Sequence, residues 1–289
     1  MEKKLKKLSK RVNIYLKNYL LKFNSSELIT PMRYGLFPGG KKIRSKIIFD
    51  VGKIFKVKHK YLLILAASVE AIHAYSLIHD DLPCMDDDKL RRGKLSTHAR
   101  FGESTAILAG NSLLTTAFEI LSDQNFKIEA KIKSRLVNFL SKCSGQAGIA
   151  EGQYLDLSYE KKKVSLKKIL NMELKKTGKL FEFCCVAPLI IKKNKKNFNT
   201  FSKIGKDIGL LFQIVDDLID FKGKAKFAGK KTQKEIKKGK ATIISLLGYE
   251  DSVKYASKLK QNIYNKLKNH KYKANDLKET INFIMERNK

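Results

Sequence analysis

Apolar residues recur at spacings of three and four through most of the chain, beginning with Leu5, Leu8, Val12 and Leu16. This spacing gathers them on one face of an α-helix, which is the pattern of an amphipathic helix packed on a core. It predicts helices near 4–23, 42–56, 59–82, 104–122, 126–157, 166–191, 198–221, 240–247, 250–268 and 274–287. Only four prolines occur in 289 residues, so long stretches contain nothing that must break a helix. The sequence therefore predicts an all-α protein.

The breaks between these helices are short and polar, and no Pro/Gly/Ser linker, repeat or low-complexity tract separates two halves. The segments 59–82 and 198–221 are apolar on most faces, so they should lie at the centre of a bundle with the other helices around them. We therefore expect a single domain over 1–289, a bundle of about ten or more helices.

The formal net charge is +32, from 60 basic and 28 acidic residues, but only eight of the basic residues are arginine. A surface that grips phosphate geometry should use the arginine fork more freely, so we interpret the charge as lysine on solvated faces and expect no nucleic-acid partner. Four cysteines show no C-x-x-C spacing, and the longest apolar run, 62–69, ends at Glu70. These features predict a reduced, cytoplasmic protein without a membrane span.

Two aspartates end the apolar helix predicted at 59–82, in the segment HDDLPCMDDD. The carboxyl end of a helix and mutual repulsion both disfavour carboxylates, so this arrangement calls for a cation. In an unbroken helix Asp80 and Asp86 would be about 240° apart. A turn after Pro83 must therefore fold the later aspartates back beside Asp80 and Asp81 if they share a metal.

The second acidic cluster, FQIVDDLID, places Asp216 and Asp220 one turn apart on one helix face, with Gln213 on the same side. Carboxylates in an otherwise apolar helix are costly unless they have charge partners. The candidate ligands in both clusters are hard oxygens with no histidine–cysteine set nearby, which favours magnesium over zinc. Two such clusters could hold several ions around one polyphosphate.

Basic residues accompany both clusters. Lys41 and Arg44 in GGKKIR open a predicted helix, where free backbone N–H groups suit an anion. Arg91, Arg92, the Lys176-Thr177 pair, Lys230 and Lys240 occupy the other positions. Any one alone would be a solvated side chain, but together they indicate a ligand that carries phosphate. For His73, two turns before Asp80, the spacing leaves a core residue and a ligand equally open, whereas His79 and His98 are predicted to be structural.

The order of these motifs resembles the trans-polyprenyl diphosphate synthases, and among them the bacterial farnesyl diphosphate synthases. The resemblance runs over nearly the whole chain, in MRYGLFPGGKKIR, EAIHAYSLIHDDLPCMDDDKLRRG, THARFGESTAILAGNSLL, EGQYLDL, KKTGKL, GLLFQIVDDLIDF, GKATIISLLG and MERNK. It implies the isoprenoid synthase fold, with helices around a central catalytic cavity, in a homodimer. It also implies an enzyme that condenses dimethylallyl or geranyl diphosphate with isopentenyl diphosphate to give farnesyl diphosphate.

The same resemblance implies a role for each motif residue. Magnesium ions would be bound by Asp80, Asp81, Asp86, Asp216 and Asp220. The allylic diphosphate would be held by Arg91, Lys176, Thr177, Gln213, Lys230 and Lys240, and isopentenyl diphosphate by Lys41, Arg44, His73 and Arg92. The catalytic step would depend on Asp80, Asp86, Arg91, Lys176, Thr177, Gln213, Asp216 and Lys230. Tyr75 and Ser76 would limit the length of the product.

Five positions depart from the family pattern. Ser45 and Ile244 stand where prolines are usual, Asn111 and Glu235 replace aspartates, and Gln233 replaces a glycine. Because Lys230 and Lys240 keep their spacing, we expect activity to survive, with an altered closing geometry of the loop that carries them.

Three other functions compete with a farnesyl synthase. The PCMDD stretch is also similar to geranylgeranyl diphosphate synthases, which make a twenty-carbon product. A terpene cyclase would use the aspartates and magnesium but would need neither GGKKIR nor a second DDxxD motif. A non-catalytic basic subunit that binds nucleic acid or membrane should have lost acidic residues, and none of the metal positions is lost.

Overall fold

The computed structural model describes residues 1–160, 162–227 and 242–287. Its helices are α1 (Glu2–Leu20), α2 (Ile29–Leu36), α3 (Ile43–Ile54), α4 (His59–Asp80), α5 (Thr97–Phe101), α6 (Glu103–Ser122), α7 (Ala130–Ser144), α8 (Ile149–Tyr159), α9 (Leu166–Glu173), α10 (Lys179–Ile191), α11 (Phe198–Phe227), α12 (Ile243–Leu247), α13 (Tyr249–Leu267) and α14 (Asn275–Glu286). Short 3₁₀ segments are η1 (Leu21–Phe23) and η4 (Lys268–Ala274), and η2 (Leu174–Gly178) is a π-helix. The predicted all-α class is confirmed.

A small hairpin interrupts the helices: β1 (Leu90–Arg91) pairs antiparallel with β2 (Lys94–Leu95). The sequence pattern did not predict this hairpin, nor α2 and α5, because each is too short to show a repeating apolar spacing.

The prediction of one helix over 126–157 is wrong, because α7 and α8 are separate helices with a turn between them. At Gly148 the backbone lies so close to α7 that an added Cβ would be 1.9 Å from the carbonyl oxygen of Cys143. Only glycine permits this approach, and the chain changes direction there.

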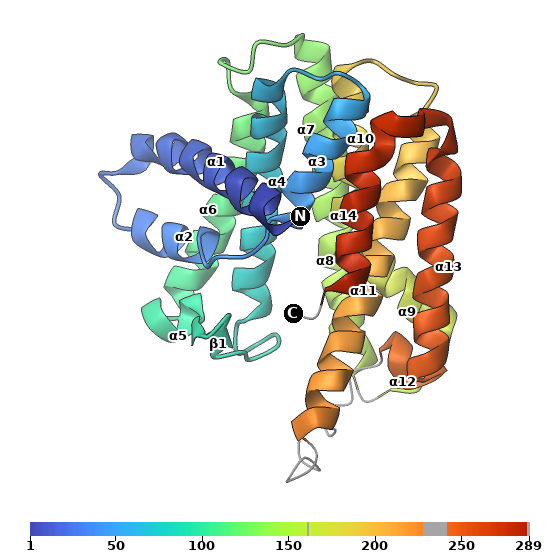
Figure 1. The fold of residues 1–289 in the computed structure, drawn as a ribbon. Coiled ribbons are helices and arrows are strands. Elements are labelled where there is room, and N and C mark those ends of the chain that lie inside the picture. Colours follow the sequence, from blue (N-terminus) through green and yellow to red (C-terminus); the bar gives the residue numbers. More distant parts are fainter. Residues whose placement is uncertain (161, 228–241, 288–289) are drawn as a thin grey trace. The chain divides into compact units, whose positions relative to one another are not determined.

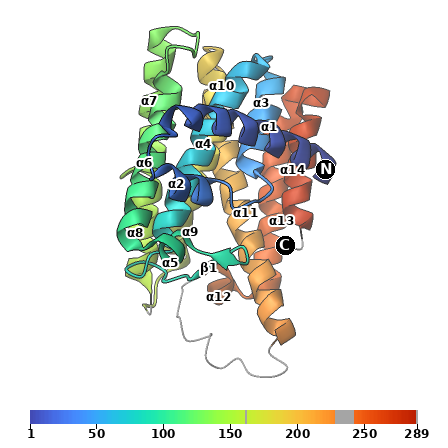
Figure 2. The same ribbon diagram turned by 90° about the vertical axis from the view of Figure 1, so that its left-hand side faces the viewer.

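The chain divides into two compact units: Met1–Leu140 with Ala187–Asn194, and Ser141–Val186 with Lys195–Lys289. In the first unit, α4 packs along α6 and α3, and α1 lies across α3 and α4 (Figures 1 and 2). In the second, α11 packs against α13, α14 and η2. The two segments predicted to be central therefore each organise the packing of one unit.

Helix α4 is long and apolar enough to cross a membrane by length and composition, with a mean hydropathy of 1.6 over its most apolar window. However, 67% of that window is buried inside the protein, as in the core helix of a soluble protein.

Candidate active site

The first acidic segment folds back on the end of α4, as the sequence predicted. The backbone N–H of Asp86 donates to the carbonyl oxygen of Asp80 at 2.9 Å, and that of Asp88 donates to Asp81 at 3.2 Å. The bonds from Met85 and Asp87 to Leu82 close the turn that follows. The chain therefore leaves the helix after Asp80, and the turn through Pro83 brings Asp86 beside Asp80.

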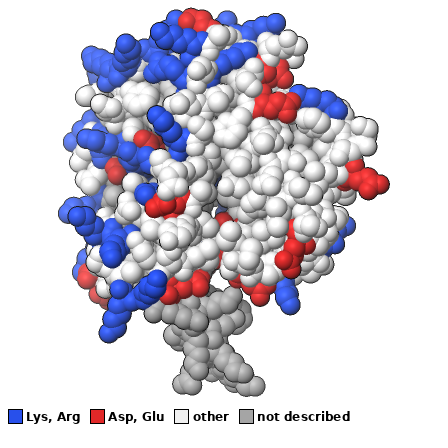
Figure 3. All heavy atoms as spheres, turned by 180° about the vertical axis from the view of Figure 1, so that it is seen from behind, with Lys and Arg blue, Asp and Glu red and all other residues white. Residues whose placement is uncertain are grey.

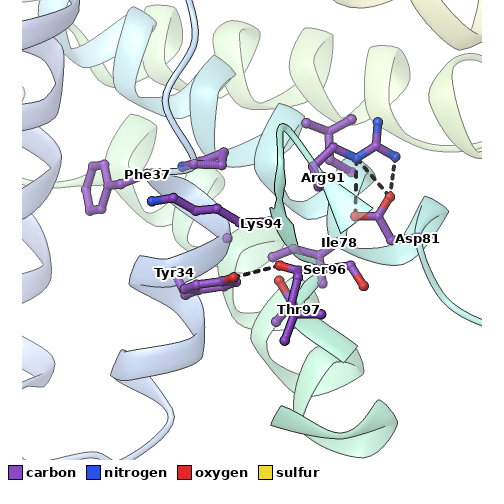
Figure 4. A pocket seen from close by; sticks show the side chains of 12 residues that line it. Tyr34, Phe37, Ile78, Asp81, Arg91, Lys94, Ser96 and Thr97 are labelled. Carbon is purple, nitrogen blue, oxygen red and sulfur yellow. Dashed lines mark hydrogen bonds and ion pairs between the residues drawn. The ribbon is translucent and has the colours of Figure 1, made fainter. Parts of the chain in front are cut away.

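Asp81 points to the side of α4 where the hairpin lies and is bound by Arg91. The Nε atom of Arg91 donates to both carboxylate oxygens of Asp81, at 2.9 and 3.3 Å, and its Nη2 atom also contacts Oδ1 (Figure 4). Burial raises the pKa of Asp81, and the arginine opposes that rise. A cavity of about 80 Å³ beside this pair is walled by Ile78, Tyr34 and Thr97. Asp81 thus links the hairpin to α4.

A cluster of basic side chains lies in the same unit, between the start of α3 and the middle of α4. The Nη1 atom of Arg44 lies 3.2 Å from Nε2 of His73, and Arg92 of the hairpin donates to the carbonyl oxygen of Gly39. Gly40 has φ +111°, and an added Cβ there would overlap the Arg92 guanidinium. The glycines thus allow Arg92 to lie against the chain just before Lys41, whose side chain is exposed.

His73 is neutral in this surrounding. Desolvation and the nearby charges of Arg44 and Arg92 lower its pKa well below the ordinary value of 6.5. Because the guanidinium of Arg44 can only donate, Nε2 of His73 accepts. The four residues predicted to hold one diphosphate therefore lie in one unit: Arg44 on α3, His73 on α4, Lys41 just before α3 and Arg92 in the turn of the hairpin. Arg44 and His73 are in direct contact.

Tyr75 lies on another face of α4, against His79. The two rings meet edge to face with centroids 5.1 Å apart, and Nε2 of His79 lies 3.1 Å from the carbonyl oxygen of Ile107 in α6. Gly110 leaves room for the imidazole, since an added Cβ would be 2.2 Å from Nε2. Ser76 donates to the carbonyl oxygen of His73 at 3.0 Å. His79 is therefore a structural link that fixes the position of Tyr75.

In the second unit, Gln213 of α11 connects two of the predicted regions. The hydroxyl of Thr177 donates to its Oε1 atom at 3.2 Å, and its Nε2 atom donates to Asp217 at 3.0 Å. Burial raises the pKa of Asp217 to about 7, with Asp216 and Asp220 contributing in the same direction. Helix α11 thus carries a third carboxylate beside the Asp216–Asp220 face, and this one is partly buried.

Thr177 belongs to the π-helix η2, which packs tightly on α8. A Cβ added to Gly152 would be 2.2 Å from the backbone nitrogen of Lys176 and 2.4 Å from its Cα. The ammonium of Lys176 donates to Asp156 of α8 at 2.5 Å. A π-helix widens the backbone and changes its hydrogen bonding locally, and such bulges often occur at functional sites.

Arg287, which follows α14, lies against the second acidic cluster. The Nη2 atom of Arg287 lies 2.7 Å from Oδ1 of Asp216 and donates to the carbonyl oxygen of Phe212 at 2.7 Å. Its guanidinium also stacks over the Phe212 ring, 3.8 Å from the centroid. Asp216 therefore already has a cationic partner.

The donor set fits magnesium with a ligand that brings its own oxygens. Among residues 1–160, 162–227 and 242–287, no three acidic, histidine or cysteine side chains are gathered closely enough to hold a metal by themselves. Mg²⁺ usually binds one or two carboxylates together with substrate phosphates, rather than a cage made only of protein. Asp80 with Asp86, and Asp216 with Asp220, each offer such a pair.

Lys230 and Lys240, together with the altered positions Gln233 and Glu235, lie outside the described residues.

Sequence reasoning missed several residues of these two groups. Arg287 and Asp156 carry no spacing signal that connects them to the acidic motifs. Asp217 is part of DDLID but lies off the face that the spacing selected. Glu70 did leave a signal, because it is the acid that ends the apolar run 62–69. Its side chain proves to be buried, at 5% exposure.

Comparison with known proteins gives one consistent result. A sequence model of the family described as Polyprenyl synthetase matches residues 25–283. A farnesyl diphosphate synthase of Micrococcus luteus is 38% identical over 281 residues, which cover 96% of this chain and 96% of that protein. Relatives named geranylgeranyl pyrophosphate synthase match over a smaller share of their own length.

Solved structures agree with these matches. An FPP/GFPP synthase from Zymomonas mobilis, an apo structure, is 33% identical with a TM-score of 0.86 and covers 99% of this chain and 100% of that one. A geranyltransferase from Helicobacter pylori, in complex with magnesium and isoprenyl diphosphate, is 30% identical with a TM-score of 0.80, covering 98% of this chain and 96% of that one.

Proposed function

The chain belongs to the polyprenyl synthetase family, and from that premise we propose that it is a farnesyl diphosphate synthase. It condenses dimethylallyl and then geranyl diphosphate with isopentenyl diphosphate, by ionisation of the allylic substrate, condensation and loss of a proton. The observation that carries this proposal is the fold-back of Asp86 onto Asp80 at the end of α4, in the same unit as the basic cluster of Arg44 and Arg92. The allylic diphosphate needs carboxylates that bind metal, and isopentenyl diphosphate needs basic side chains.

Magnesium is the proposed cofactor, with several ions in each active site. Asp80, Asp81, Asp86, Asp216 and Asp220 would hold them, with Arg91 fixing the position of Asp81. When bound, Mg²⁺ neutralises the allylic diphosphate and makes it a better leaving group. The carboxylates would determine the positions of the Mg²⁺ ions. Arg91, Lys176, Lys230 and Lys240 would neutralise the remaining negative charge of the diphosphate.

The residues around η2 would stabilise the allylic cation. Carbonyl groups near Thr177 and the Gln213 amide present negative ends of dipoles, and preorganised dipoles of this kind stabilise developing charge. In the structure the Gln213 oxygen accepts from Thr177, so the two residues act as one unit. The departing diphosphate can take the final proton, so no protein nucleophile is needed.

Isopentenyl diphosphate would bind at Lys41, Arg44, His73 and Arg92. Neutral His73 can donate one hydrogen bond without adding charge, and the arginine forks suit a diphosphate. Tyr75 and Ser76 would limit the product to fifteen carbons.

Three further properties belong to this proposal: one domain formed by both units, a cytoplasmic protein without stable membrane insertion, and a homodimer. Figure 3 shows that basic side chains gather in parts of one face, whereas a broad area carries neither basic nor acidic ones. Exposed apolar side chains in the first unit include Ile107 and Leu108 of α6, at 41% and 55% exposure. A second copy covering such side chains would stabilise a dimer.

A product assay tests the proposal. Purified protein is incubated with Mg²⁺, labelled isopentenyl diphosphate and either dimethylallyl or geranyl diphosphate, and the products are separated by chain length. We expect fifteen-carbon diphosphate from both allylic substrates and none after chelation of Mg²⁺. A cyclic product from geranyl diphosphate alone would indicate a terpene cyclase, and a twenty-carbon main product a geranylgeranyl synthase.

A non-catalytic basic subunit would give no product with either substrate. If such a protein bound DNA and this binding disappeared at moderate salt, the binding would be a non-specific effect of the +32 charge.

A further inference from the structure

A buried carboxylate lies behind the basic cluster, on the side of α4 that faces α3. Glu70 is 5% exposed and stands one turn before His73. The hydroxyl of Ser45 donates to its Oε1 atom at 2.6 Å, and the ammonium of Lys42 donates to Oε2 at 3.2 Å. Each oxygen of the carboxylate thus has its own donor, and both donors come from the beginning of α3.

Both donors are as deeply buried as the carboxylate. Ser45 is 0% exposed, and the Lys42 side chain is 8% exposed. Burial alone would raise the pKa of Glu70, but Lys42, the Ser45 hydrogen bond and Arg44 outweigh it, so the pKa lies below its ordinary value. Glu70 is therefore an anion that partly balances the surrounding cations when no substrate is bound.

The segment that these bonds hold is conformationally unusual. Gly39, Gly40 and Lys42 all have positive φ, of 92°, 111° and 47°. A non-glycine residue in the left-handed region costs free energy and persists only where its surroundings fix it. For Lys42 the bond to Glu70 is such a constraint, and Ser45 fixes the helix one turn later. Between these two anchors lies Arg44, and just before them lies Lys41.

We propose that Ser45 and Glu70 form a buried clamp that positions Lys41 and Arg44 for one diphosphate. Both are positioning residues, because an anion placed in contact with a diphosphate would repel it and Ser45 is fully buried. The assignment of that diphosphate to isopentenyl diphosphate depends on the proposed function; the clamp itself depends on the contacts above.

The test compares Ser45→Ala with Ser68→Ala in the full-length protein. Ser68 is also 0% exposed and lies on α4, but its hydroxyl donates only to the carbonyl oxygen of Ile64, within the same helix. The measurements are the KM for each substrate, kcat, calorimetric binding of isopentenyl diphosphate and the midpoint of thermal unfolding. We expect Ser45→Ala to raise the KM and the dissociation constant for isopentenyl diphosphate about tenfold, as for one lost bond to a charged group. The KM for geranyl diphosphate and kcat should change by less than about twofold.

A double-mutant cycle with Glu70→Gln then tests whether the two residues act together. The glutamine keeps an acceptor for Ser45 but lacks the charge, so Ser45→Ala should cost clearly less in this background than in the wild type. Simply additive effects of Ser45→Ala and Glu70→Gln on isopentenyl diphosphate binding would refute the clamp. So would a Ser45→Ala protein whose isopentenyl diphosphate binding matches that of Ser68→Ala. Wild-type protein that does not bind isopentenyl diphosphate would refute the proposed function instead.

Discussion

The guanidinium of Arg287 lies 2.7 Å from the carboxylate of Asp216 and stacks on Phe212, so the residue that follows α14 supplies a cation beside the second acidic motif. The Arg287 side chain is 7% exposed. This burial lowers the pKa of Arg287, and the negative charges of Asp216 and Asp220 oppose that decrease. A metal ion at Asp216 must share or displace this partner.

Replacing Arg287 should therefore change the magnesium requirement. We expect Arg287→Ala to lower the Mg²⁺ concentration for half-maximal activity several-fold, while removing about 1 kcal/mol of metal-free stability through the lost ion pair and ring contact. Arg135→Ala, at an exposed position on α7, serves as the control. An unchanged or higher Mg²⁺ requirement in Arg287→Ala would show that the arginine does not compete with metal.

Removal of one aspartate from either motif should stop the reaction without unfolding the protein. Asp80→Ala and Asp216→Ala each remove a side chain that holds the charge of the leaving group, which should lower kcat by at least about 10². Asp251→Ala is the control, because Asp251 is exposed at the start of α13 and pairs with Lys254 on the same helix. Circular dichroism checks the fold, and near-normal turnover in Asp216→Ala would contradict the metal assignment.

The contact between Gly152 and the π-helix predicts a requirement for glycine. In Gly152→Ala the new methyl would overlap backbone atoms of Lys176, so η2 must shift. We expect a loss of about 1–3 kcal/mol in stability together with a marked fall in kcat. Gly178→Ala, whose added Cβ would meet only ordinary contacts at 3.6 Å, should keep more of both. If kcat were the same in the two variants, the contact between Gly152 and the π-helix would not matter for catalysis.

His73 predicts a pH dependence of stability with a definite sign. Its pKa is well below 6.5 in the folded protein, so the unfolded chain binds a proton below that pH which the folded chain does not. Stability then falls as the pH decreases through about 6.5, by at most about 1.4 kcal/mol per pH unit. In His73→Gln the part of the pH dependence that is due to His73 should disappear. His79→Gln, the same replacement on the same helix, is the control. Denaturant titrations at pH 7.5 and 5.5 measure this pH dependence, and parallel curves for wild type and His73→Gln would contradict the assignment.

The parts of this protein that could be predicted are those encoded locally. The apolar spacing predicted α4 and α11, and the helix-breaking Pro83 predicted the return of Asp86 to Asp80. The split of 126–157 at Gly148 is also local, but it depends on a close backbone approach that periodicity does not record.

Contacts between distant segments could not be predicted in this way. The pairing of Arg287 with Asp216 joins the segment after α14 to α11, and that of Ser45 with Glu70 joins α3 to α4. Glu70 did stand out as the acid that ends the longest apolar run, yet only the fold shows which donors it meets.

Product length is the last prediction, and it depends on how firmly Tyr75 is held. The Tyr75 ring meets His79 edge to face, and His79 is fixed in turn by the carbonyl oxygen of Ile107 on α6. Tyr75 lies five residues before Asp80, which is about 7.5 Å along the helix axis. A tail that runs from a diphosphate near Asp80 along α4 would therefore meet a ring that cannot easily move aside.

Shortening this side chain should open the way for a longer tail. We expect Tyr75→Ala to shift the products towards twenty carbons or more while isopentenyl diphosphate is still consumed, and Tyr75→Phe to keep the fifteen-carbon product because the ring remains. His79→Ala should give a partial shift, since it loosens the ring without removing it. Chromatography of the dephosphorylated products measures each outcome. If Tyr75→Ala still stops at fifteen carbons with normal turnover, another part of the protein limits the chain, and Tyr75 is only a packing residue between α4 and α6.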